Sequence, residues 1–242
     1  MTNAIDISAT AVGILGNIAA VLLFLSPMPT FYEIWRKKSS GDFSGVPYVA
    51  SLANCLVWVL YGSPLLTHGL LPVITINGFG VVLQSFYLLI FVPFSKGKKR
   101  IQMLAYVLTV LACFGLIIVV TIFVLPEGRK AFFVGTLAAV LNTAMYAAPL
   151  SIMRHVIVTK SVAAMPFLLS LCTFFNSCFW AVYGFLKKDT FIIIPNILGV
   201  ILAAAQLVLY AYYHNYEKKH PTKDVSNGNL PNVKRLETVQ QV

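Results

Sequence analysis

The sequence predicts an all-α membrane protein with seven transmembrane helices in a 3+1+3 arrangement of two parallel triple-helix bundles. Three observations predict it: an apolar composition, seven apolar segments of spanning length, and an internal repeat that skips one segment. Of the 242 residues, 58% are hydrophobic and 11% are charged, whereas a soluble domain carries about a quarter charged residues. So little polar surface cannot cover a water-soluble globule, and lipid is therefore the expected solvent.

Seven segments are long enough to cross a bilayer, which takes about 20 mainly apolar residues. They cover residues 8–34, 46–66, 70–94, 101–125, 131–157, 166–186 and 190–213. The first is too long for a secretory signal, follows no basic residue and lacks a small-residue cleavage site. We therefore interpret it as a retained span.

The basic residues predict the orientation. With the N-terminus placed outside, 14 of the 18 Lys and Arg residues fall on one side of the membrane and 4 on the other. The basic side is expected in the cytosol, together with the C-terminus. The net charge of +10 is thus explained by topology, and no nucleic-acid partner is expected. The four cysteines lie inside apolar spans and match no zinc or redox spacing.

A repeat relates the two ends of the chain. The stretch Trp58-Val-Leu-Tyr61-Gly62 recurs 122 positions later as Trp180-Ala-Val-Tyr183-Gly184. The same offset joins Leu23 with Met145, Pro27 with Pro149, and Asn54 with Asn176. An offset of 119 joins Pro47 with Pro166 and Asn77 with Asn196. Spans 1–3 therefore match spans 5–7, and span 4 has no counterpart.

The unmatched span has a geometric consequence. Three spans reverse the direction of the chain, so a fourth lets the second half cross the membrane in the same direction as the first. We predict a first bundle over 1–94, a linker helix with its loops over 95–130, and a second bundle over 131–214. A disordered cytosolic tail is expected over 215–242. Two like-oriented halves that face each other enclose a central cavity.

Paired polar and aromatic side chains predict a binding site in that cavity. Asn54 and Trp58 are four residues apart and share one helix face, as do Asn176 and Trp180. An amide donates and accepts hydrogen bonds, and an indole offers an apolar plate with one donor. Such a pair suits the hydroxyl edges and C–H faces of a sugar. A single Asn would more readily be explained as a contact between helices, but the symmetric register favours a ligand site.

Proline positions predict flexible points. Leu23 and Met145 lie four residues before Pro27 and Pro149, so their carbonyls lose the usual helical partner and the spans should bend there. Bending without motion stays open as an alternative. From spacing alone, Pro47 and Pro166 are helix starts.

Several chemistries are not expected. No Asp, Glu, Lys, Arg or His lies at the centre of any span, so no group is available to couple transport to an ion. A passive facilitator follows. The sequence has no nucleophile–base pair, phosphate loop or metal cluster, so we expect no enzyme, no cofactor and no metal site.

Together, the repeated motifs and the proline quartet resemble the SWEET family of sugar transporters over residues 8–215, a family in which parallel repeats are a known arrangement. The resemblance implies passive, bidirectional transport of sugar by alternating access. It implies that Asn77 and Asn196, with the two Asn/Trp pairs, Leu23 and Met145, line the sugar pocket. It assigns all four prolines to hinges and a cytosolic gate, and Tyr61 and Asp189 to an extracellular gate.

The gate region departs from the family pattern. Members often carry a lysine four residues after the gate tyrosine, where this chain has Leu65. Asp189 precedes the last span, where an acidic residue also commonly complements a helix N-terminus, so gating and capping both stay open. Tyr183, the repeat mate of Tyr61, is expected to pack.

Substrate and location rest on the same resemblance. Large side chains at the positions of Leu23, Asn54, Met145 and Asn176 accompany monosaccharide transport in the family, which favours a hexose such as glucose. A sucrose-type disaccharide is the alternative. Three other functions are alternatives. A seven-span receptor has no reason for the duplication, and a scaffold would recruit its partners through the tail. A two-repeat transporter of amino acids would need an acidic or basic group in the pocket, which is absent. The expected partners are the sugar and the bilayer; a homo-oligomer stays open. We expect the plasma membrane, with internal membranes open.

Overall fold

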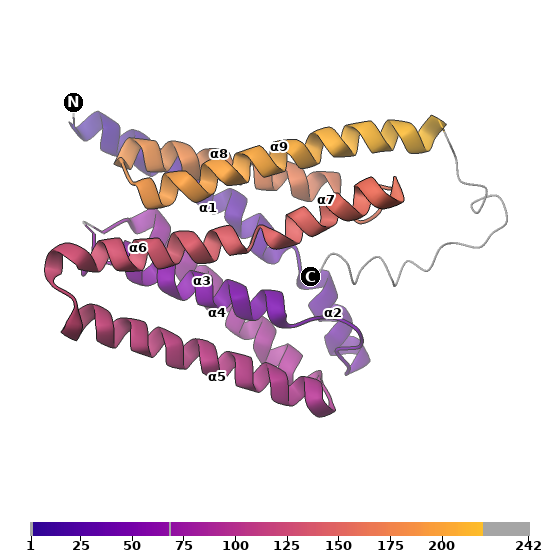
Figure 1. Cartoon of the computed structure of the whole chain (residues 1–242), viewed down its shortest axis with the longest axis horizontal. Coiled ribbons are helices and arrows are strands. Elements are labelled where there is room, and N and C mark those ends of the chain that lie inside the picture. Colours follow the sequence, from indigo (N-terminus) through magenta and orange to yellow (C-terminus); the bar gives the residue numbers. More distant parts are fainter. Residues whose placement is uncertain (1, 68, 220–242) are drawn as a thin grey trace.

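The computed structural model describes residues 2–67 and 69–219, and this part of the chain consists of helices joined by short connections (Figure 1). In chain order the elements are α1 Thr2–Leu25, α2 Met28–Lys37, α3 Val46–Gly62, α4 Leu71–Phe94, α5 Gly97–Val119, the π-helical turn η1 Val120–Val124, α6 Glu127–Ala144, α7 Ala147–Thr159, α8 Phe167–Lys187 and α9 Thr190–Lys219.

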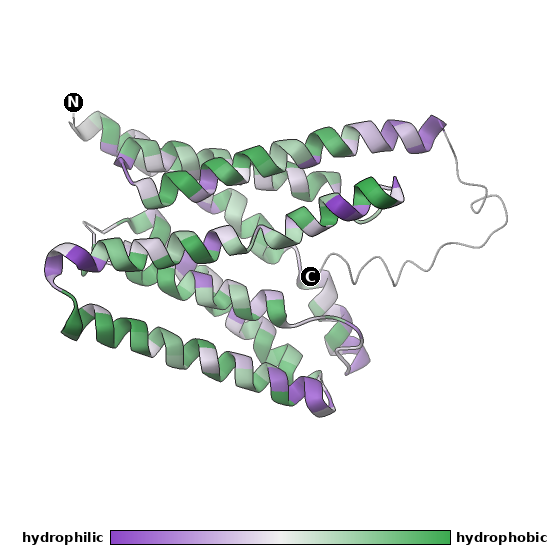
Figure 2. Cartoon of the chain, in the orientation of Figure 1, coloured by the Kyte–Doolittle hydropathy of each residue, from purple (hydrophilic) through white to green (hydrophobic). Residues whose placement is uncertain are grey.

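The helices supply the predicted spans. Six stretches of the described chain are long and apolar enough to cross a membrane: Ala4–Lys37, Leu71–Phe94, Gly97–Val124, Glu127–Thr159, Phe167–Lys187 and Thr190–Lys219. The apolar helix α3, with 17 residues, rises about 26 Å and completes the seven. Hydrophilic residues gather at helix ends, notably where α2 and α9 end and where α5 begins (Figure 2). The all-α membrane fold is confirmed.

Packing follows the repeat. In the first bundle α4 contacts α1, α2 and α3, and in the second bundle α9 contacts α6, α7 and α8. The bundles meet where α1 packs against α8 and where α3 packs against α6. Because α1 matches α6 and α3 matches α8, the repeat exchanges these two contacts. This is the arrangement that two parallel halves around a shared axis require. The linker helix α5 packs against α3 and α4 of the first bundle.

Small residues on α1 bring the bundles close together. A side chain at Gly13 would meet Pro72 of α4 at 2.7 Å and Tyr183 of α8 at 3.2 Å, and one at Gly16 would meet the indole of Trp180 at 3.1 Å. Membrane helices approach closely where small residues line the contact. α1 is thereby seated against both its own bundle and the opposite one.

The first and fifth spans are each interrupted by a short break near their proline. α1 ends at Leu25 and α2 begins at Met28, with Pro27 in the gap. The bend predicted at this proline thus coincides with a two-residue break in the helix, within one span, Ala4–Lys37. At the first break, the Ser26 N–H and hydroxyl both donate to the Leu23 carbonyl, at 3.2 and 2.7 Å. These bonds close a tight turn in place of the next helical turn.

The fifth span repeats the break. α6 ends at Ala144, α7 begins at Ala147, and Pro149 lies in the first turn of α7. Each break is tied to the third helix of its bundle by a tyrosine. Tyr87 of α4 donates to the Phe24 carbonyl at 3.0 Å, and Tyr146 donates to the Pro195 carbonyl of α9 at 2.7 Å.

Two predicted boundaries shift. α6 begins at Glu127 rather than at 131, because Pro126 is extended (φ −66°, ψ 150°) and stops the preceding chain. An acidic first residue also suits a helix N-terminus. The predicted tail, 215–242, begins too early because α9 continues to Lys219. There the Glu217 carboxylate accepts the Val162 N–H at 3.0 Å, which holds the last turns of the helix. Residues 220–242 lie outside the described residues.

The close approach of α1 gives a testable prediction. Gly13→Leu should lower the free energy of unfolding by roughly 1–3 kcal/mol, because the added side chain overpacks a filled contact. The measurement is the thermal unfolding midpoint of the purified protein in detergent. Gly115→Leu on α5 is the matched control, since nothing lies within 4 Å of a side chain placed there. Equal midpoints for both variants would contradict the assignment.

Candidate functional site

A cavity of about 280 Å³ lies between the two bundles. Its lining side chains come from α1, α3 and α4 of the first bundle and from α6 to α9 of the second. All eight residues that the sequence proposes for substrate binding line it: Leu23, Asn54, Trp58, Asn77, Met145, Asn176, Trp180 and Asn196. Residues up to 173 positions apart in the chain, from Leu23 to Asn196, thus share one site.

Asn77 and Asn196 are held in equivalent ways. Asn77 Nδ2 donates to the Val73 carbonyl at 2.9 Å, and Asn196 Nδ2 donates to the Ile192 carbonyl at 2.8 Å. Each bond spans one helical turn and fixes the amide on its helix. One N–H and the side-chain oxygen of each amide stay available for a ligand in the cavity.

Asn54 and Asn176 present unsatisfied acceptors. Both Oδ1 atoms are buried, and neither has a hydrogen-bond partner within the described residues. Leaving a buried acceptor unpaired costs about 1–3 kcal/mol. Because these two atoms are repeat mates on the wall of one cavity, a ligand that offers hydroxyl donors would recover this cost on both sides.

Two buried indoles form apolar plates in the wall. Trp58 and Trp180 are 6% and 8% exposed. Each packs edge to face on the tyrosine three residues later, Tyr61 at 5.6 Å and Tyr183 at 5.4 Å between ring centroids. The repeated Trp-x-x-Tyr motif therefore acts as a support, in which the tyrosine fixes the tilt of the indole.

The cavity also contains residues that the sequence analysis missed. Asn142, Tyr146 and Ser177 line the second half of the wall. The offset of 122 relates them to Ala20, Phe24 and Cys55. A search for identical residues at equivalent positions of the two repeats misses these three, because the other repeat has a different residue at each position. Extending the offset to every residue one turn from Leu23 and Met145 would have found Asn142.

The four prolines all lie at a helix break or in or just before the first turn of a helix. Pro149 lines the cavity. Pro27 lies in the α1–α2 break, Pro47 lies in the first turn of α3, and Pro166 precedes α8 as its N-cap. Pro47 and Pro166 thus occupy the helix starts that their spacing indicates, and the gating role of all four stays a proposal.

The side of the molecule that carries the N-terminus, called the N-terminal side below, is closed by a hydrogen bond between the bundles. Tyr61 Oη of α3 donates to Asp189 Oδ2 at 2.7 Å. Asp189 Oδ1 accepts the N–H groups of Phe191 and Ile192, at 3.0 and 3.2 Å, at the start of α9. One carboxylate therefore both caps a helix and bridges the bundles. Leu65 is 70% exposed, and Tyr183 packs as expected.

The opposite side is joined less tightly. The contacts between bundles come chiefly from α1 with α8 and α3 with α6, whereas α2 packs chiefly against α4 and α7 against α9. Each of these two short helices thus packs mainly within its own bundle.

This fold and site define a membrane transporter built from two like-oriented repeats around one central cavity. The family described as "Sugar efflux transporter for intercellular exchange" matches residues 10–100 and 132–218. These two ranges correspond to the two bundles and omit all but the first turn of the linker helix. The chain belongs to this family, the SWEET transporters, which are transporters and not enzymes.

Individual relatives agree over most of the chain. The bidirectional sugar transporter SWEET1a of Oryza sativa subsp. japonica is 43% identical over 216 residues, which is 89% of this chain and 79% of the relative. SWEET4 of Oryza sativa subsp. indica is 44% identical over 210 residues, 86% and 81% of the two chains. A solved structure of a eukaryotic SWEET transporter is 42% identical, with a TM-score of 0.84 over 87% of this chain and 99% of that one.

The bridging tyrosine gives a prediction. Tyr61→Phe should lower the free energy of unfolding by about 1.5–3 kcal/mol, since it removes a hydrogen bond to a charged acceptor. The thermal midpoint in detergent measures this. Tyr183→Phe is the matched control, because the Tyr183 hydroxyl has no partner in the described part of the chain. A drop of the same size in both variants would contradict the bridging role.

Proposed function

We propose that this protein carries one sugar molecule at a time across a membrane, passively and in both directions, by alternating access. The observation that carries the proposal is the set of symmetric amides and indoles on one cavity wall, with two buried acceptors left unpaired. The relatives named as bidirectional sugar transporters support it.

The side chains match the chemistry of a sugar. Its hydroxyls donate to the Asn54 and Asn176 oxygens and bond the amides of Asn77 and Asn196, while its C–H faces lie on the indoles. Because the groups come from both bundles, the ligand contacts both halves at once. A ligand held in this way has comparable contacts whichever side of the cavity is open.

Transport follows from rocking of the two bundles around this site. With the N-terminus outside, as the basic loops indicate, Tyr61 and Asp189 form the extracellular gate. The breaks at Pro27 and Pro149 then separate the segments that close the cavity from those that open it, with Pro47 and Pro166 at the cytosolic ends.

The cavity supports uncoupled transport. None of its lining residues is Asp, Glu, Lys, Arg or His. Proton- or sodium-coupled carriers use such groups inside the membrane. The sugar gradient alone then sets the direction of net movement.

The wall favours a monosaccharide. Leu23 and Met145 face the cavity together with Asn54 and Asn176, and these four side chains leave a cavity of about 280 Å³. A disaccharide would need space that they occupy. We therefore propose a hexose such as glucose, with a sucrose-type disaccharide as the alternative and the plasma membrane as the location.

Substitution of the fixed amides tests the site. Asn77→Ala and Asn196→Ala should each abolish glucose uptake while leaving expression and membrane insertion intact, because each removes hydrogen bonds to the ligand. Radiolabelled uptake in cells that lack hexose transport measures the effect. Asn215→Ala, at an exposed position on α9, is the control and should transport normally. Unchanged uptake in both pocket variants would defeat the pocket assignment.

Counterflow in proteoliposomes tests the mechanism. Labelled glucose should accumulate transiently against unlabelled glucose, at the same rate with and without a pH gradient, because no cavity group carries a proton. Sucrose should exchange much more slowly. A rate that follows the pH gradient would refute uncoupled transport, and faster exchange of sucrose would refute the hexose preference.

A further inference from the structure

The repeat predicts two bridges on the N-terminal side, but only one of them has the expected residues. Tyr61 of the first repeat meets Asp189 of the second. Tyr183, the mate of Tyr61, would need an acidic residue at the position that matches Asp189. At the offset of 119 this position is Leu70. The Tyr183 hydroxyl is accordingly buried without a partner among the described residues.

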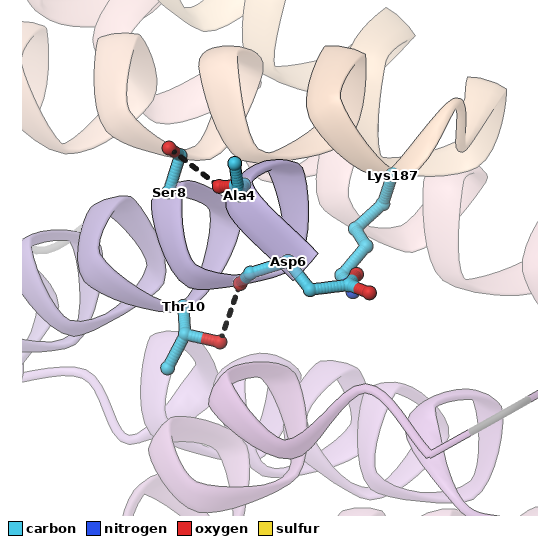
Figure 3. A network of polar contacts seen from close by, with 5 residues as sticks. All are labelled: Ala4, Asp6, Ser8, Thr10 and Lys187. Atoms are coloured by element: carbon cyan, nitrogen blue, oxygen red, sulfur yellow. Dashed lines mark hydrogen bonds and ion pairs between the residues drawn. The ribbon is translucent and has the colours of Figure 1, made fainter. Parts of the chain in front are cut away.

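An ion pair joins the bundles at the same end. Lys187 Nζ donates to Asp6 Oδ1 at 2.8 Å. Lys187 is the last residue of α8 in the second bundle, and Asp6 lies near the start of α1 in the first. Figure 3 shows the lysine extending from its helix to the carboxylate, 181 positions away in the chain. The contact therefore crosses from one bundle to the other.

The start of α1 is reinforced around this carboxylate. Ser8 Oγ donates to the Ala4 carbonyl and Thr10 Oγ1 donates to the Asp6 carbonyl, each at 2.9 Å (Figure 3). Helix ends fray unless they are tied down. Both bonds run within α1, so Asp6 lies in a helical turn whose backbone is hydrogen-bonded.

The ion pair and the tyrosine bridge border the same space. A second cavity on this side is lined by Asp6 and Lys187 together with Leu65, Leu70 and Asp189. The Asp6–Lys187 pair and Asp189 thus lie on the wall of one cavity at this end of the molecule. Leu65 occupies the position at which family members often carry a lysine. Lys187, from the other bundle, places a positive charge on the wall of the same cavity.

We propose that the Asp6–Lys187 ion pair is a second latch, which with Tyr61–Asp189 holds the N-terminal side closed. The latch takes the place of the bridge that Leu70 cannot make. It rests on the proposed alternating-access function, because a latch matters only if the bundles part at this end. In the transport cycle the pair breaks when the N-terminal side opens and forms again when it closes.

The pair is partly exposed, which sets the size of the effect. The side chains of Lys187 and Asp6 are 28% and 65% exposed. Ion pairs at such sites are weak and are screened by salt. Loss of the latch should therefore raise the ratio of molecules open on the N-terminal side to molecules closed there by roughly two- to fivefold. The protein should still fold.

Labelling of a single cysteine in the central cavity tests the latch. Thr173, which lines that cavity, is replaced by Cys in a background whose four native cysteines are substituted. A membrane-impermeant thiol reagent is applied from the N-terminal side. Asp6→Asn and Lys187→Gln should each raise the labelling rate roughly two- to fivefold, and the double variant should rise no further than either alone. Lys188→Gln, at the neighbouring residue, is the control and should label like the parent.

Two further measurements test whether the effect depends on the charges of the pair. The exchanged pair Asp6→Lys with Lys187→Asp should return labelling toward the parent rate. High salt should speed labelling of the parent but not of the neutral double variant. Parent-like rates in both single variants, or additive rates in the double, would overturn the latch. Labelling needs no sugar, so a failed counterflow experiment with altered labelling would defeat the proposed function and leave the latch standing.

Discussion

The direction in which each half crosses the membrane is the constraint on which the rest of this structure depends. Three helices alone would leave the second repeat inverted, and Asn54 and Asn176 would then lie at opposite heights. The unmatched helix α5 reverses the chain once more and packs on the first bundle without entering the cavity. Every paired feature of the site, from the indoles to the breaks at Pro27 and Pro149, follows from that reversal.

The two repeats share some of the residues that line the cavity and differ in others. Four of the cavity amides and both indoles are matched, but Asn142, Tyr146 and Ser177 correspond to Ala20, Phe24 and Cys55 in the other repeat. The second half of the wall therefore offers more hydrogen-bonding groups than the first.

Closure of the N-terminal side is likewise asymmetric. One carboxylate, Asp189, caps α9 through Oδ1 and accepts the Tyr61 hydroxyl at Oδ2, so its two oxygens serve a helix end and a contact between the bundles. Its mate position holds Leu70, and a charged pair between α1 and α8 lies on that flank instead. Duplicated halves can diverge in this way because a contact between bundles needs only one donor and one acceptor, whichever repeat supplies them.

The sequence by itself determined the number of spans and the duplication, because hydropathy is a local property and the repeat preserves spacing. The repeat together with the family resemblance pointed to eight of the residues that line the cavity. The sequence could not show that the first and fifth spans break, since the Ser26 bonds to Leu23 and the separate packing of α2 and α7 decide between a bend and a break. Nor could it find the Asp6–Lys187 pair. That pair depends on how α1 packs against α8 through Gly13 and Gly16, and only tertiary packing brings residues 181 positions apart into contact.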